Sequence, residues 1–140
     1  MYLPFLKFDE LHLFEPHPEL MAAPSYYSTM YNITFSQKLT TVGMRDETDV
    51  ISFLRKHVTV DDFVVLKYDV DEVVEGLTME WVFLADLMQS EELALVDELF
   101  IELHFKYDSI DWDFGRHSMQ QAFDIQRQLR QCGLAIHAWP

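Results

Sequence analysis

Short apolar runs separated by turn-forming residues mark the first part of the chain. Leu11–Phe14 is one such run, and Pro16 and Pro18 end it, since proline has no backbone N–H to donate within a sheet or helix. Residues 31–44 are rich in threonine, aromatic and branched side chains, with a polar break near residues 36–38. We expect a strand at 11–14 that ends in a turn, and then a strand or a small hairpin within 31–44.

A helix and a strongly apolar strand are predicted next. Asp49 can cap a helix, because apolar side chains recur at helical spacing over residues 50–57. A polar turn at Val58–Asp62 then leads into the almost continuously apolar run Phe63–Tyr68. A short apolar run of this kind is typical of a strand that is covered on both faces in a parallel sheet.

Two further helices are indicated by their capping residues. Thr78 is placed to cap one helix, and Glu80 falls in its first turn, where a negative charge is favoured by the helix dipole. Ser118 is placed to cap the other, and Gly133 to end it. The expected inward positions are Met79, Val82, Phe83 and Leu87 in the first helix, and Met119, Ala122, Phe123, Leu129 and Cys132 in the second.

The segment Leu93–Phe105 fits two patterns. Its apolar residues match helical spacing, but from Glu98 onward apolar and polar positions also alternate as in a strand. We choose a strand from about Glu98, and we expect a last strand at Leu134–Trp139. The resulting alternation of strands and helices predicts one α/β domain over residues 1–140, with a mostly parallel sheet.

Composition and charge narrow the classes of partner. The 140 residues carry a formal net charge of -14, which would repel phosphate backbones, so nucleic acid is not an expected partner. No apolar run approaches the length of a membrane span, and the first residues lack the pattern of a signal peptide. We expect a chain that is cytoplasmic by default. Cys132 is the single cysteine, expected to be a buried, inert thiol.

Acidic residues follow several of the predicted strands. In open α/β sheets ligands bind beyond the carboxyl ends of the strands, so these positions are candidates for chemistry. Glu15 follows the first strand, and it either accepts hydrogen bonds from a ribose or is a solvated turn residue before proline. Asp69 and Asp71 follow the strand 63–68, and they are either a chance acidic cluster or ligands of a divalent cation.

Glu102 and His104 lie two residues apart at the end of the next predicted strand. This spacing would let them act together as a base and its orienting group, or as metal ligands. The alternative is that His104 is a satisfied polar residue at a strand end. No cluster of histidines or cysteines has the spacing of a metal site.

Several of these stretches carry a family resemblance. They are residues 14–20, Val64–Asp71, Val96–His104 and His117–Trp139. Together they resemble the FkbM-type family of S-adenosylmethionine-dependent methyltransferases, particularly its plant and algal branch. The resemblance implies a Rossmann-like methyltransferase three-layer sandwich, with Glu15 at the ribose and Asp69 beside the methyl group and the acceptor. It also implies O-methyl transfer to a small or glycan-like acceptor, with Asp69 assisted by Glu102 or His104.

The chain departs from that family at two places. Asp69-Val70-Asp71-Glu72 stands where the family has aspartate, a branched residue, glutamate and glycine, so the role of Asp71 differs or the motif is split. No Gly-x-Gly occurs and no glycine precedes Glu15, so the glycine-rich turn against the cofactor has no counterpart. We therefore expect a fold that is incomplete at its amino end and binds S-adenosylmethionine weakly or not at all.

Two alternatives from other classes remain open. The first is a non-catalytic domain that keeps the fold as an interaction module, which the missing glycine-rich turn supports. A central strand missing from the sheet would also leave unpaired backbone groups, which a second copy or a partner chain could cover. The other alternative is a metal-dependent glycosyltransferase that holds its cation with Asp69 and Asp71, since hard cations prefer oxygen ligands.

Overall fold

A computed structural model describes residues 8–14, 32–36, 49–70, 73–74, 77–104 and 117–138. The chain divides into two compact units, residues 1–40 and residues 41–140. The expectation of a single domain over the whole chain stays a prediction.

The first unit contains a pair of parallel strands. Strand β1 (Glu10–Phe14) pairs with β2 (Asn32–Ser36), with Glu10 opposite Asn32 and Phe14 opposite Ser36. Both predicted strands are confirmed, with β2 ending where the polar break was expected. The rest of the predicted segment 31–44 lies outside the described residues.

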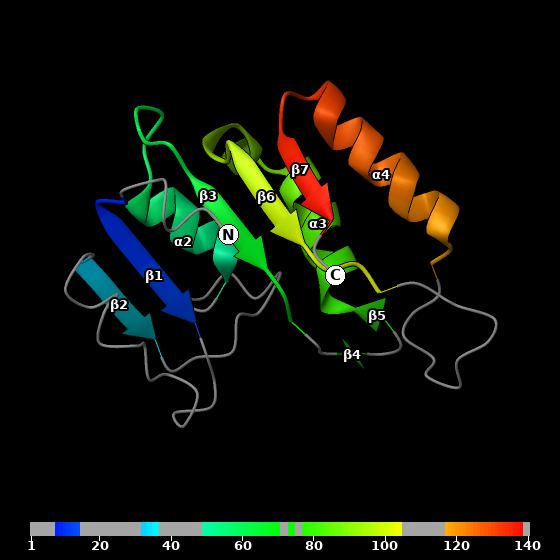
Figure 1. Cartoon of the computed structure of the whole chain (residues 1–140), viewed down its shortest axis with the longest axis horizontal. Coiled ribbons are helices and arrows are strands. Elements are labelled where there is room, and N and C mark those ends of the chain that lie inside the picture. The colour runs from blue at the N-terminus through cyan, green and yellow to red at the C-terminus, as the bar shows by residue number, and fades with distance from the viewer. Residues whose placement is uncertain are drawn as a thin grey trace. The chain divides into compact units, whose positions relative to one another are not determined.

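The second unit is an α/β arrangement built on a three-stranded parallel sheet (Figure 1). Its elements are α2 (Val50–His57), β3 (Val65–Tyr68), β4 (Val73–Val74), β5 (Leu77–Thr78), α3 (Met79–Gln89), the 3-10 helix η2 (Glu91–Leu95), β6 (Glu98–Ile101), α4 (Met119–Gln131) and β7 (Ala135–Ala138). The sheet order is β3-β6-β7, with an α-helix in each connection. The alternation expected from the sequence is thereby confirmed for this unit. The short antiparallel pair β4-β5 was not expected.

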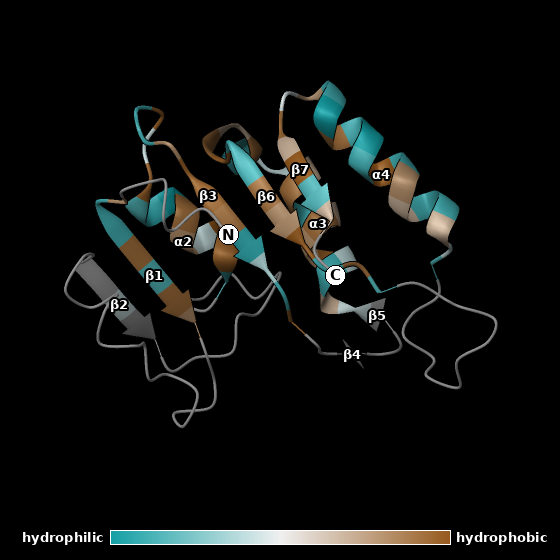
Figure 2. Cartoon of the chain, in the orientation of Figure 1, coloured by the Kyte–Doolittle hydropathy of each residue, from teal (hydrophilic) through white to brown (hydrophobic). Residues whose placement is uncertain are grey.

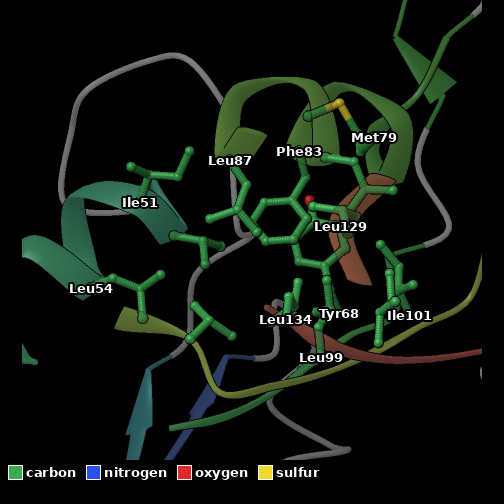
Figure 3. Close-up of a cluster of buried hydrophobic side chains, with 14 residues drawn as sticks. Ile51, Leu54, Tyr68, Met79, Phe83, Leu87, Leu99, Ile101, Leu129 and Leu134 are labelled. Atoms are coloured by element: carbon green, nitrogen blue, oxygen red, sulfur yellow. The ribbon is translucent and has the colours of Figure 1, made fainter. Parts of the chain in front are cut away.

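The core lies between the sheet and its helices (Figure 3). Phe83 and Leu87 of α3, Leu99 of β6 and Leu129 of α4 have no exposed surface. Burying one such side chain stabilises a fold by about 1.5–3 kcal/mol. Tyr68 stacks on Phe83 with ring centroids 4.2 Å apart, which joins the end of β3 to α3.

The strand β3 is shorter and less buried than the sequence indicated. Phe63 lies outside it with 60% of its surface exposed, and Lys67 within it is exposed. Phe63 lies outside β3 because hydrogen bonding to the segment that leads into β6 begins at Val64. Asp97 accepts a hydrogen bond from the Val64 N–H at 2.8 Å, and the Val64 carbonyl accepts from the N–H of Asp97 at 3.1 Å. The expectation of a strand covered on both faces from Phe63 onward was wrong.

The predicted caps of α2 and α3 differ in outcome. Asp49 caps α2 as expected, accepting from the backbone N–H groups of Ile51 and Ser52. Thr78 does precede α3, but its side chain makes no capping hydrogen bond and is buried. The position was predicted correctly and the stabilising contact was not.

The caps of α4 are confirmed. Ser118 and Gln121 form a reciprocal capping box at its start. Gly133 ends the helix with φ +97, and Leu134 N–H donates to the Leu129 carbonyl at 3.1 Å. This is a Schellman arrangement, in which a left-handed residue suits glycine.

The inward face of α4 was predicted correctly at Ala122 and Leu129 and wrongly at Met119, Phe123 and Cys132. Ala122, Gln126 and Leu129 are buried, at a spacing of four and three residues. Phe123 is 61% exposed, because it lies about 100° around the helix from Ala122. Met119 and Cys132 are also exposed, so the expectation of a buried thiol was wrong. In Figure 2 most of the α4 ribbon has the colour of hydrophilic residues.

Candidate functional site

The carboxyl ends of β3 and β6 lie side by side because these strands are parallel and in register. Tyr68 is opposite Ile101, and the next amide, that of Glu102, donates to the Tyr68 carbonyl at 3.3 Å. The residues that follow each strand therefore leave the sheet at one edge. This is the edge at which open α/β sheets bind ligands.

Asp69 lies at this edge between a cation and an acid. Lys67 Nζ donates a hydrogen bond to Asp69 Oδ2, and the Asp69 side chain is 31% exposed. The Lys67 hydrogen bond holds the pKa of Asp69 below its ordinary value of 3.8; partial burial opposes this shift, and a hydrogen bond with Glu102 adds to it.

His104 lies between two acidic side chains. Its Nε2 is 3.7 Å from Glu102 Oε1, and its Nδ1 forms a hydrogen bond with Glu80 Oε1. The imidazole side chain is 19% exposed. The cluster thus runs from Lys67 through Asp69, Glu102 and His104 to Glu80; we call these five residues the strand-end cluster.

Glu80 is the member that sequence reasoning missed. It was placed in the first turn of α3 only for its charge at a helix start, yet it has no exposed surface. Among the described residues its second oxygen, Oε2, has no hydrogen-bond partner. One signal was available in the sequence. The run Leu77–Ala85 is apolar except for a threonine, which is buried, and for Glu80, its single ionisable residue. A charge within such a run is rarely buried unless it is paired.

Trp81 ties the end of β6 to the start of α4. Its indole Nε1 donates to the His104 carbonyl at 2.7 Å, and its ring stacks on His117 with centroids 3.9 Å apart. Burial lowers the pKa of His117 from its ordinary value of 6.5. His117 therefore favours the neutral form beside the indole.

The structure brings three of the predicted site residues together and does not describe the others. Asp69, Glu102 and His104 belong to the strand-end cluster. Glu15 and Asp71 lie outside the described residues, so their proposed roles stay predictions. The expectation that strand-end residues converge is confirmed for β3 and β6.

The cluster suits proton exchange. It combines the Asp69 carboxylate, the neighbouring Glu102 side chain and an imidazole in contact with the buried Glu80, and these are residue types used in general acid–base catalysis. Within the described ranges no group of three histidine, cysteine or acidic side chains is arranged to hold a metal ion. The glycosyltransferase alternative depends on Asp71, which lies outside those ranges.

Fold and cluster together define an α/β domain with an acid–base group at the carboxyl edge of a parallel sheet. The chain belongs to the family described as a domain of unknown function, DUF7870, whose pattern covers residues 24–140. No curated protein and no solved structure matches the chain. In the part of the chain that the structure describes, the helices are too short or too polar to cross a membrane.

Proposed function

We propose that this chain is a methyltransferase-like domain with a Rossmann-like sheet, serving O-methyl transfer from S-adenosylmethionine to a small or glycan-like acceptor. The observation that carries the proposal is the position of Asp69, Glu102 and His104 beyond the carboxyl ends of two adjacent parallel strands. The resemblance to the FkbM-type family also supports the proposal, because two of the resembling stretches contain these three residues.

The charge at this edge fits the proposed methyl donor. Asp69 lies at the end of β3, and its pKa is held below the ordinary value of 3.8 by the Lys67 hydrogen bond, so its carboxylate form is favoured. Carboxylates stabilise a nearby cation, and S-adenosylmethionine supplies an electrophilic methyl group on a positively charged sulfur when it is bound. Glu15 would hold the ribose in this proposal.

The role proposed for the strand-end cluster is to orient and deprotonate the acceptor. A hydroxyl has a high pKa, so a base within hydrogen-bond reach helps it to become nucleophilic. His104 and Asp69 are the residues proposed to accept that proton. Correct alignment of the two reactants supplies much of the remaining acceleration.

The experiment is an NMR titration of the chain with S-adenosylmethionine up to millimolar concentration. Because the chain has no glycine-rich turn, we expect weak binding, seen as selective shifts of the Asp69, Glu102 and His104 signals. The signals of Glu98, at the start of β6, should not shift. Calorimetry on the same sample tests the expected weakness, and a micromolar dissociation constant would contradict it.

A matched pair of variants shows whether binding occurs at the proposed edge. Glu102→Gln changes a glutamate directly after β6, and Glu98→Gln changes a glutamate at the start of β6. We expect the first to abolish the selective shifts and the second to leave them unchanged. Equal shifts at both ends, or none at millimolar ligand, would overturn the proposed function.

A second function, a non-catalytic interaction module, is favoured by an apolar pair on α4. Met119 and Phe123 lie one turn apart and are 44% and 61% exposed. Adjacent exposed apolar side chains are what a contact surface requires, although a patch of two is small. Analytical ultracentrifugation of the wild type and of the double variant Met119→Ser/Phe123→Ser tests self-association, and an identical monomer in both would count against a homo-oligomer.

A further inference from the structure

The buried carboxylate of Glu80 is costly for the fold. Glu80 has no exposed surface, and among the described residues only one of its two oxygens has a hydrogen-bond partner. Burial of a carboxylate is unfavourable unless its hydrogen bonds compensate, and a well-packed apolar side chain would cost less. A leucine at this position would therefore stabilise the fold more than the buried carboxylate does. The contact with His104 is what the carboxylate adds.

Two consecutive residues of α3 hold His104 at two points. Glu80 contacts the imidazole Nδ1, while the Trp81 indole donates to the His104 main-chain carbonyl at 2.7 Å. One contact fixes the ring and the other fixes the backbone that carries it. Since α3 is packed in the core through Phe83 and Leu87, these contacts rest on a rigid element.

The contact with Glu80 also selects one form of the neutral ring. When Glu80 is a carboxylate it can only accept hydrogen bonds, so Nδ1 carries the proton in this pair. The other nitrogen, Nε2, then carries the lone pair, and it lies 3.7 Å from Glu102 Oε1. Among the described residues, the ionisable groups near the ring include Glu80 from α3, Glu102 after β6 and Asp69 after β3.

We propose that Glu80 is a positioning residue, which keeps the His104 proton on Nδ1 and directs Nε2 toward the Asp69–Glu102 pair. Nε2 is then the atom that accepts a proton at this edge; this last step rests on the proposed function. When an acceptor hydroxyl loses its proton, the O–H bond breaks, its electron pair stays on oxygen, and the proton binds Nε2. The carboxylate of Glu80 balances the positive charge of the resulting imidazolium.

The test is the tautomer of His104, read by long-range proton–nitrogen correlation on chain labelled with nitrogen-15 histidine. At alkaline pH, where the ring is neutral, we expect the wild type to carry its proton on Nδ1. In Glu80→Leu we expect the proton to move to Nε2, the preference of an unconstrained histidine side chain. A proton on Nε2 in the wild type, or an unchanged tautomer in Glu80→Leu, would overturn the proposal.

Two further variants separate positioning from folding. Glu80→Gln keeps the size of the side chain and serves if Glu80→Leu does not fold; we expect it to weaken the preference for Nδ1–H, and an unchanged preference would overturn the proposal. Glu98→Leu removes the carboxylate 3.3 Å from His137 Nε2. It should alter the His137 signals and leave the His104 tautomer unchanged.

The tautomer measurement and the cofactor titration can overturn their two proposals independently. If His104 carries its proton on Nδ1 but S-adenosylmethionine leaves the strand-end signals unmoved, the positioning role stands and the methyltransferase function does not. If the cofactor shifts those signals while His104 carries its proton on Nε2, the function stands and Glu80 has no positioning role.

Discussion

The two ends of the three-stranded sheet both carry acidic residues, but their partners differ. At the amino end Asp97 accepts from the Val64 amide, and Glu92, with its side chain 9% exposed, accepts from Arg55 Nε at 2.6 Å. The Arg55 hydrogen bond lowers the pKa of Glu92 from its ordinary value of 4.5. Asp97 and Glu92 therefore each have a partner that is permanently a donor.

At the carboxyl end the acids face groups that can exchange protons. Asp69 shares a hydrogen bond with Glu102, and His104 lies between Glu102 and Glu80. Lys67 is the one fixed cation of the strand-end cluster. The comparison shows that burial alone does not mark a site, since Glu92 and Glu80 are both buried. What distinguishes them is whether the partner can change its protonation state.

The largest effect is expected from Leu99→Ala, because Leu99 is fully buried in β6 between the two ends. Deletion of a core leucine side chain costs about 2–5 kcal/mol. The free energy of unfolding in urea should fall by that amount, and hydrogen exchange should accelerate at both ends. Val60→Ala, at a position 82% exposed, is the control and should change stability by less than about 0.5 kcal/mol. Faster exchange at only one end would show that the ends do not share a core.

A smaller effect is expected at the amino end from Arg55→Met. This change keeps much of the side chain but leaves Glu92 buried without its guanidinium partner, so the urea midpoint should fall. Arg127→Met is the matched control, because its partner Asp124 is 36% exposed and can be solvated. Equal midpoints for the two variants would show that Glu92 does not depend on Arg55. The His104 tautomer should be the same in both.

The smallest effect is a change of pH dependence at the carboxyl end. Burial lowers the pKa of His117 in the folded chain, so the unfolded chain binds its proton more readily. The stability from neutral His117 is complete above the ordinary value of 6.5 and is lost as the pH falls through the folded pKa. His117→Phe keeps an aromatic ring against Trp81 and removes this titration. Unfolding free energies measured between about pH 7.5 and about pH 5.5 should vary less in the variant; an equal slope would contradict the assignment.

Local sequence signals were sufficient for most elements of the second unit. Asp49, the Ser118 capping box and Gly133 set helix ends through contacts within a few residues, so they could be found in the sequence. The strand from Glu98 followed from alternation with its neighbours. The buried face of α4 could not be found in this way, because it depends on the rotation of the helix against the sheet.

The candidate site was predictable only in part. The position after a strand singled out Asp69, Glu102 and His104, because parallel strands end at a common edge. Glu80 was not singled out, since nothing in α3 by itself shows that a charge in its first turn meets a histidine 24 residues away.

The sequence by itself determined the order of strands and helices, the caps of α2 and α4, and the acidic character of the strand ends. These depend on interactions between residues close in the chain. Only the tertiary structure decided that the site at the carboxyl edge includes Glu80, that Phe63 and Phe123 are exposed, and that β3 pairs with β6. Those outcomes depend on packing between segments far apart in the chain, which a local pattern of apolar and polar residues does not specify.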